Sequence, residues 1–254
     1  MIGMNDNNVL QVRDLCKQYP SFLLDHVSFT LEKGRITGFI GRNGAGKTTT
    51  LKSLLNFVHP DTGDISVFGM NFCENELEIK HKIGFVAGGF SYYPRKKLKT
   101  IADVTKSFYS TWDERVYREY LHLFGLDENK TPSQLSDGMK VKFALLLALS
   151  HGAELLILDE PTSGLDPVSR EELMEIFLDL KRMGTTILFS THITSDLDKC
   201  ADNIIYIKSG KIVKSASLSE FTDYYKKKLC VSGYAGSVNL EQIMLYIERG
   251  EGRS

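Results

Sequence analysis

The sequence has 254 residues, of which 42% are hydrophobic and 25% charged, enough to bury a substantial core and remain soluble. Its 31 basic and 32 acidic residues give a formal net charge of -1, which argues against a nucleic-acid clamp with a basic stripe. The four cysteines lie far apart with no CxxC pair, so their spacing indicates neither a disulfide framework nor a zinc site and fits a reducing cytosol.

The sequence shows no sign of a membrane span or a signal peptide. Residues 1–8 lack a basic flank followed by an apolar core. The most apolar run, Phe143 to Leu149, is far shorter than the ~20 residues that a bilayer span needs. Any role in transport would therefore use separate membrane subunits.

The first part of the chain is predicted to be rich in strands. Apolar alternation and turn residues indicate strands at 9–12, 27–31, 36–40 and 64–68. The strand at 36–40 runs into a glycine-rich segment, and a helix is expected from Lys47 to about Val58.

The glycine-rich segment Gly41 to Thr48 reads GRNGAGKT and matches the phosphate-binding pattern GxxxxGK[ST] in full. Backbone N–H groups of such a loop point at phosphate oxygens, aided by the positive end of the helix dipole. Lys47 is predicted to reach the β- and γ-phosphates, and the Thr48 hydroxyl to bind Mg²⁺. The predicted ATP-binding residues of this segment are Gly41, Asn43, Gly44, Ala45, Gly46, Lys47, Thr48 and Thr49. The alternative is a glycine-rich turn that happens to precede a lysine.

From about residue 89 to 151 the pattern becomes helical. Tyr117, Tyr120, Leu121 and Phe124 fall on one helix face, and a long helix is expected from Ser136 to Ser150. We predict that this stretch is an α-helical subdomain inserted into the rest of the fold.

Two acidic residues follow a strand that is apolar on both faces. Residues 155–158 are Leu, Leu, Ile and Leu, and Asp159 and Glu160 come next, where the carboxyl end of a central parallel strand opens onto the ligand crevice. Asp159 is predicted to hold Mg²⁺, and Glu160 to act as general base toward the attacking water. A solvated acidic turn is the alternative.

The remainder alternates helix and strand. A helix with apolar positions at 173, 176, 177 and 180 should end near Gly184, before a strand at 186–189 and a hairpin around Ser209. This order predicts an α/β fold with a mostly parallel sheet. Residues 1–230 are expected to form one domain, and residues 231–254 a short tail with a last short helix.

The order of these motifs resembles the ATPase domain of ABC transporters over roughly residues 9–215. Residues 135–139 resemble its LSGGQ signature, residues 163–166 its D-loop, and residues 190–192 its switch histidine segment. Within the family the chain is most similar to ATPases of bacterial ABC-2-type exporters. The resemblance implies a P-loop NTPase core with an N-terminal antiparallel β subdomain.

The resemblance also implies roles for residues outside the phosphate loop. Ser136 and Gly138 would contact the γ-phosphate held by a second subunit, so that two ATP molecules lie between two chains. A plain helix cap is the other interpretation of Ser136 and is compatible with that role. Asp166 would lie at the dimer seam, or cap the helix that begins at Pro167, or do both.

Two further implied contacts have structural alternatives. His192 would contact the γ-phosphate and Glu160, although a lone histidine after a strand is more often structural. Tyr19 would stack on adenine, and a buried core tyrosine is the alternative.

The sequence departs from the family pattern at two places. The family's glutamine after the strand at 83–86 should fall at or next to Gly88, where this chain offers no side-chain ligand. Asp137 replaces the first glycine of the signature pair. Either change could slow turnover, but the predicted catalytic residues Lys47, Glu160 and His192 are all present.

The function predicted from these features is that of the ATP-binding, ATP-hydrolysing subunit of a membrane transporter, and we expect the transport to be export. It would use ATP and Mg²⁺, act as a homodimer or as a heterodimer with another ABC ATPase, and sit on the cytoplasmic face of the membrane through permease subunits. One alternative is a poorly hydrolysing regulatory partner of a sister ATPase. Another is a soluble ABC ATPase acting on DNA or the ribosome, which the near-neutral charge and the lack of a coiled-coil insertion oppose.

Overall fold

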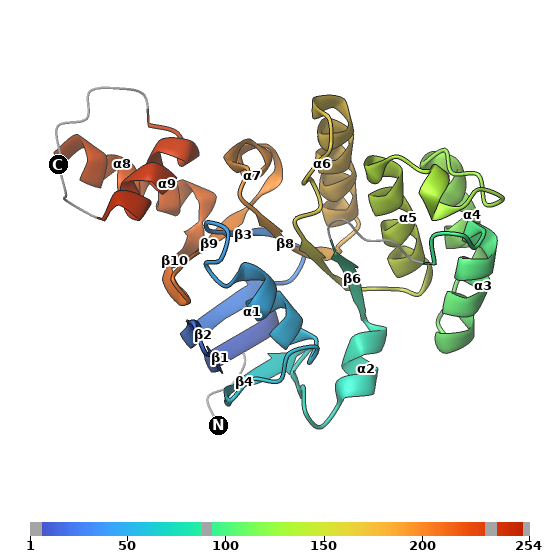
Figure 1. The fold of residues 1–254 in the computed structure, drawn as a ribbon, viewed down its shortest axis with the longest axis horizontal. Helices are drawn as coiled ribbons and strands as arrows, with labels where there is room; N and C mark the ends of the chain where they lie inside the picture. The colour runs from blue at the N-terminus through green and yellow to red at the C-terminus, as the bar shows by residue number, and fades with distance from the viewer. Residues whose placement is uncertain (1–6, 88–92, 232–237, 251–254) are drawn as a thin grey trace.

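The computed structural model describes residues 7–87, 93–231 and 238–250, which form two sheets with helices around them (Figure 1). The smaller sheet has the strand order β2-β1-β4-β5, and its neighbouring strands are antiparallel. The larger sheet has the order β10-β9-β3-β8-β7-β6 and is parallel except for the β9–β10 hairpin. The predicted α/β fold with a mostly parallel sheet and an N-terminal antiparallel part is confirmed.

The strands follow the predicted order, but the first two are much longer than the predicted 9–12 and 27–31, and the short β5 was not predicted. Their bounds are β1 Asn8–Tyr19, β2 Phe22–Glu32, β3 Ile36–Ile40, β4 Thr62–Val67, β5 Met70–Asn71, β6 Ile83–Ala87, β7 Leu155–Asp159, β8 Thr186–Thr191, β9 Asn203–Lys208 and β10 Lys211–Ser217.

The helices include three that the sequence patterns did not predict. Their bounds are α1 Lys47–Leu54, α2 Glu76–His81, α3 Leu98–Phe108, α4 Glu114–Leu123, the 3-10 turn η1 Pro132–Gln134, α5 Asp137–Ser150, α6 Pro167–Arg182, α7 Thr194–Cys200, α8 Leu218–Val231 and α9 Leu240–Arg249. Helix α1 is shorter than predicted, because the chain turns at Asn56, whose φ is 57°. Helices α2, α7 and α8 were missed, and α9 is the expected last short helix.

The larger sheet separates two hydrophobic cores. Leu156 and Leu158 of β7 pack into one core with α5 and α6, whereas Leu155 and Ile157 of the same strand pack into the other with α1 and the antiparallel sheet. Figure 1 shows α5, α6 and α7 on one side of this sheet and α1 with the antiparallel sheet on the other. Every residue of β3, β7 and β8 is buried, as expected for central parallel strands covered on both faces.

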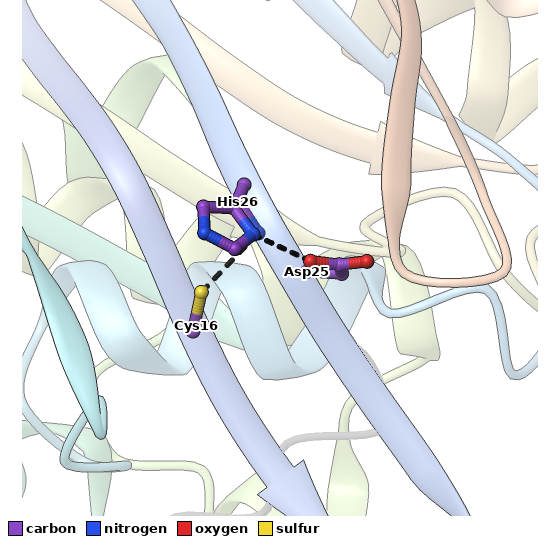
Figure 2. Close-up of side chains that lie close together, drawn as sticks. All are labelled: Cys16, Asp25 and His26. Carbon is purple, nitrogen blue, oxygen red and sulfur yellow. Dashed lines mark hydrogen bonds and ion pairs between the residues drawn. The ribbon is translucent and has the colours of Figure 1, made fainter.

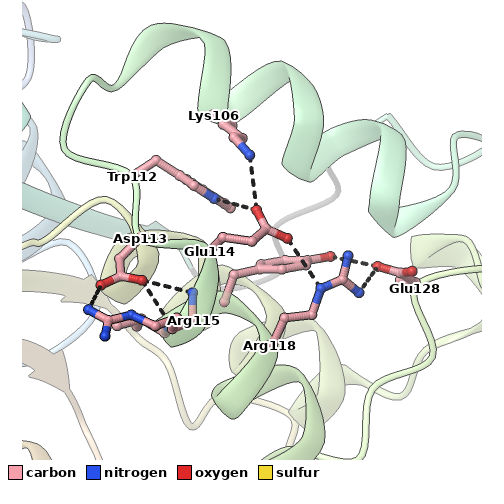
Figure 3. Close-up of polar contacts among 9 residues, drawn as sticks. Lys106, Trp112, Asp113, Glu114, Arg115, Arg118 and Glu128 are labelled. Carbon is pink, nitrogen blue, oxygen red and sulfur yellow. Dashed lines mark hydrogen bonds and ion pairs between the residues drawn. The ribbon is translucent and has the colours of Figure 1, made fainter.

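Helices α3 and α4 are joined by a polar network (Figure 3). The Glu114 carboxylate accepts from Lys106 Nζ at 3.0 Å, from the Trp112 indole N–H at 3.2 Å and from Arg118 Nε at 3.2 Å. Arg118 also bonds Glu128 at 3.0 Å, in the loop after α4. Exposed pairs contribute little one by one, but a network that shares partners holds the helices in one arrangement.

The helical subdomain at about 89–151 and the division at residue 230 remain predictions. Tail helix α9 packs back onto the rest of the fold, since Glu248 accepts from the Tyr206 hydroxyl at 2.8 Å. Among the residues that the structure describes, none of the helices is long and apolar enough to cross a bilayer.

Candidate nucleotide site

The loop between β3 and α1 adopts a conformation that depends on glycine. Gly46 has a φ of 112° and is the N-cap of α1, where a Cβ would lie 2.9 Å from the ring of Phe22. A Cβ on Gly41 would lie only 2.3 Å from the carbonyl oxygen of Ile207. The backbone therefore runs close to its neighbours at both ends of the loop and leads directly into the N-terminus of α1, where free N–H groups favour an anion.

Lys47 is the buried cation of this loop. Its side chain is only 5% exposed, and Nζ donates to the carbonyl oxygens of Gly41 at 2.7 Å and Arg42 at 3.3 Å. Nζ also lies 3.2 Å from Oε1 of Glu160. A buried ammonium needs such partners, because desolvating an unpaired charge is costly. Lys47 is therefore held in position at the mouth of the loop.

Asp159 and Glu160 lie at the carboxyl end of β7, and Ser190 at the end of β8 holds both. The Ser190 hydroxyl donates to Asp159 Oδ1 at 2.6 Å, and the Glu160 backbone N–H donates to the same hydroxyl oxygen at 2.9 Å. Glu160 has a φ of 51°, an uncommon left-handed conformation for a non-glycine residue. Such strain is maintained only by the surrounding structure and tends to occur at functional sites.

His192 follows β8 and completes the cluster. Its Nδ1 lies 2.8 Å from Oε2 of Glu160, so the two oxygens of Glu160 are shared between Lys47 and His192. His192 is 44% exposed and borders the open side of the site. Strands β3, β7 and β8 thus bring three residues that are far apart in the sequence to one edge of the sheet, as their parallel register requires.

A cleft of about 780 Å³ lies over this cluster. Its walls come from the β1–β2 turn, the phosphate loop, the start of α1 and the ends of β7 and β8, with the lining residues Tyr19, Pro20, Ser21, Phe22, Arg42, Asn43, Gly44, Gly46, Lys47, Thr48, Thr49, Glu160, Ser163 and His192. Tyr19 is half-buried at one wall, so the alternative of a core tyrosine is wrong. The aromatic rings at one end of the cleft suit the base of a nucleotide, and the lysine and N–H donors at the other end suit its phosphates.

Ser136, Gly138 and Asp166 are not among the described residues that line this cleft. Ser136 is the N-cap of α5 and accepts from the Met139 N–H at 3.2 Å, and Asp166 caps α6 by accepting from Val168 and Ser169. The Ser169 hydroxyl, foremost among these donors, lowers the pKa of Asp166. Both predicted capping interactions are confirmed.

Asp137, which replaces a glycine of the family's signature segment, interacts with a residue of its own helix α5. Its Oδ1 lies 2.8 Å from Lys140 Nζ, which offsets the added negative charge locally. The other departure, Gly88, lies outside the described residues.

Two contributors to the site were not predicted. Ser190 was noted only as part of the histidine segment, although a hydroxyl at the end of the strand beside β7 can reach the carboxylates there. Phe22 faces Tyr19 across the β1–β2 turn, with ring centroids 6.5 Å apart. The presence of aromatic residues on both sides of a tight turn could have predicted that Phe22 lies beside Tyr19 in the site.

Comparison with known proteins agrees with this geometry. Residues 24–163 match the ABC transporter family, and this match covers more than half of the chain. The chain belongs to the ABC transporter family. It is 34% identical to the bacitracin transport ATP-binding protein BcrA of Bacillus licheniformis over 226 residues, which are 87% of this chain and 72% of that protein.

Solved structures show the same fold. A structure described as the ATP-binding subunit of an ABC transporter has a TM-score of 0.79 at 26% identity and covers 94% of this chain and 98% of its own. A dimeric ATP-binding cassette in a post-hydrolysis state with ADP and phosphate has a TM-score of 0.72 at 23% identity, covering 82% and 98%. The chain is thus the ATP-binding subunit of an ABC transporter, and its activity is ATP hydrolysis that drives transport.

Proposed function

We propose that this ABC ATPase binds MgATP in the cleft over the phosphate loop and hydrolyses it with Lys47, Glu160 and His192. The observation that supports this most directly is the contact of Lys47 Nζ and His192 Nδ1 with the two oxygens of one carboxylate, Glu160. A cation, a carboxylate and an imidazole then meet where the terminal phosphate of a nucleotide on the loop would lie.

The residues beside this cluster fit a magnesium ion. Thr48 lines the cleft, and Asp159 is almost buried at the end of β7, so both offer the oxygen ligands that Mg²⁺ prefers. When bound, the ion would neutralise phosphate charge. Ser190 holds the Asp159 carboxylate in one orientation, as an outer-shell partner does.

The contacts of Glu160 suggest how its carboxylate becomes free to act as general base toward water. Without phosphate nearby, Oε1 is paired with Lys47. Phosphate oxygens are also strong acceptors for an ammonium, so we infer that a bound nucleotide takes Lys47 from Glu160 and leaves Glu160 to accept a proton from water. The hydrogen bond from His192 then orients the carboxylate.

The helix-terminus residues point to a dimer. The start of α5, with Ser136 and Gly138, offers the N–H groups of a helix terminus to an anion, and Asp166 precedes the neighbouring helix α6. These three residues do not line the cleft of their own chain. A second chain would bring them to the phosphate of the first. The dimeric post-hydrolysis cassette, which shares the fold, supports this arrangement. We infer a homodimer, with a heterodimer of two ABC ATPases as the alternative.

A second surface suits a permease subunit. A groove of about 860 Å³ runs along α3, with Tyr93 70%, Val104 48% and Phe108 71% exposed. Large exposed apolar side chains that gather in one groove mark an interaction site. Because BcrA is named for bacitracin transport, we infer that the cargo is moved outward.

The decisive experiment combines turnover and assembly in the isolated chain. Purified wild-type chain should hydrolyse ATP with Mg²⁺, whereas Glu160→Gln should bind ATP normally, lose about 10²–10⁴-fold in turnover and form a dimer on a sizing column. Glu172→Gln, an exposed acid paired with Lys142, is the matched control and should behave as wild type. Failure of the wild type to hydrolyse ATP despite tight binding would favour the regulatory alternative.

A further inference from the structure

Strand β2 carries a β-bulge close to the turn that joins it to β1. Leu15 pairs with Val27 and Lys17 pairs with Leu24, so the single residue Cys16 lies opposite the two residues Asp25 and His26. A bulge of two residues against one re-aims side chains that would otherwise point to opposite faces of the sheet. Consecutive residues of β2 can therefore both turn toward Cys16.

The three side chains form a compact group of different ligand types (Figure 2). Their candidate ligand atoms, one thiol sulfur, one ring nitrogen and one carboxylate oxygen, all lie within 4.8 Å of one another. His26 Nδ1 lies 2.6 Å from Asp25 Oδ1, and the His26 backbone N–H donates to Cys16 Sγ at 3.3 Å. Bond lengths of 2.0–2.3 Å to a tetrahedral ion place neighbouring ligand atoms roughly 3.5 Å apart, so small side-chain shifts suffice.

We propose that Cys16, Asp25 and His26 bind a zinc-class divalent cation, with water in the fourth position. Thiolate, imidazole and carboxylate are the ligand set of zinc, and three protein ligands with one open position are a known arrangement for this ion. The thiol proton leaves to solvent when the ion binds Sγ, and the neutral His26 ring, bound through Nδ1, carries its one N–H on Nε2.

The backbone and the surroundings support this site. His26 has a φ of 49°, a left-handed conformation that costs energy outside glycine, and this is what brings its ring beside Asp25. Its side chain is 71% exposed, so an ion can enter from solvent.

Asp25 already has the outer partner that a metal ligand usually has. Its Oδ2 lies 2.7 Å from Lys211 Nζ of β10, which leaves Oδ1 for the ion and fixes the direction of the carboxylate. The cysteine spacing gave no sign of such a site, because two of the ligands are reached through strand pairing rather than along the chain.

The ion would join β1 to β2 just below the turn that carries Tyr19 and Phe22. None of its ligands lines the nucleotide cleft, so a test of metal binding at this site does not depend on whether the chain binds ATP. Binding to the folded chain alone would also stabilise it.

The test is a cobalt titration of the purified, reduced, nucleotide-free chain, since Co²⁺ substitutes for zinc and its thiolate complexes have a charge-transfer absorption band. We expect one such band in the wild type, displaced by Zn²⁺, and a rise in melting temperature with Zn²⁺. Cys16→Ser should abolish the band, and His26→Gln should weaken the affinity by about tenfold or more. The double variant Cys73→Ser with Cys230→Ser, at two other exposed cysteines, should keep the wild-type band.

The outcomes decide the proposal clearly. Absence of the band in the wild type, its survival in Cys16→Ser, or an unchanged affinity in His26→Gln would each overturn it. Ions bound by the carboxylates and histidine of the nucleotide site give no thiolate band and are therefore not mistaken for this one. If Cys16→Ser does not fold, His26→Gln and the double cysteine variant still separate the two results.

Discussion

The two groups of proposed nucleotide contacts differ in how the fold presents them. Lys47, Glu160 and His192 contact one another at the edge of one sheet, and Lys47 is 5% exposed. Ser136 and Asp166 lie at exposed helix starts, where each bonds only to its own helix. One chain thus brings the first group together by itself, whereas the second group, under the proposed function, needs a second chain.

The difference shows how two kinds of element position chemistry. Parallel strands in register place their ends side by side, so distant residues converge within one chain. A helix start offers free N–H groups outward along its axis, so what it contacts depends on what lies beyond the helix. Variants in the two groups should therefore affect different stages of the cycle.

The largest effect is expected at Lys47. Lys47→Ala removes the buried cation proposed to contact the phosphates, so nucleotide affinity should fall by about 2–5 kcal/mol, roughly thirtyfold or more. Calorimetry with ATP measures this, and Lys52→Ala, on the exposed face of α1, serves as the control. Unchanged affinity in a folded variant would break the assignment of this half of the site.

The next effect concerns the helix that carries Ser136. His151 caps the far end of α5, is 4% exposed and stacks on Tyr109 at 4.0 Å, with no partner described for Nδ1. Burial lowers the pKa of His151 to about 4 from 6.5. The unfolded chain therefore takes up the proton first, and stability falls as the pH drops from about 6.5 to 4, by about 3 kcal/mol in total.

His151→Phe should remove this pH dependence while keeping the stacked ring. Denaturant unfolding between pH 7 and 4 should give a flatter profile for this variant than for the wild type. His122→Gln, an exposed position on α4, should leave the wild-type slope in place. A parallel decline in His151→Phe and wild type would show that other groups cause the acid sensitivity.

The smallest effect is expected at Ser136, and it tests directly whether the second group of residues contacts nucleotide. Ser136→Ala removes the cap of α5, costing about 1 kcal/mol of stability, and should lower ATP turnover while leaving ATP binding to the single chain unchanged. Asp113→Ala removes the cap of α4, which bonds Arg115 and Val116, and is the matched control for lost capping alone (Figure 3). If both variants lower turnover equally, Ser136 acts only as a cap.

Much of the site could be predicted because its residues follow local patterns. The GRNGAGKT segment between a strand and a helix, and the two acids after 155–158, predict a phosphate loop and a carboxylate edge from adjacent residues alone. The caps at Ser136 and Asp166 were predictable for the same reason. The roles of these residues toward nucleotide remain the proposals given above.

Other features could not be read from neighbouring residues. Ser190 reaches Asp159 only because β8 pairs with β7, and α8 lacks a strong sequence signal for its boundaries. The shortening of α1 reflects the turn at Asn56, a local choice that competes with helix propensity.

The sequence by itself therefore determined the order of elements, the phosphate loop and the family. These depend on periodicity, capping and short motifs, which act over a few residues. Only the tertiary structure decided that Lys47 pairs with Glu160, that Ser136 and Asp166 do not line the cleft, and that Cys16 meets Asp25 and His26. These contacts depend on strand register and on shared buried surface between distant segments, which no local pattern specifies.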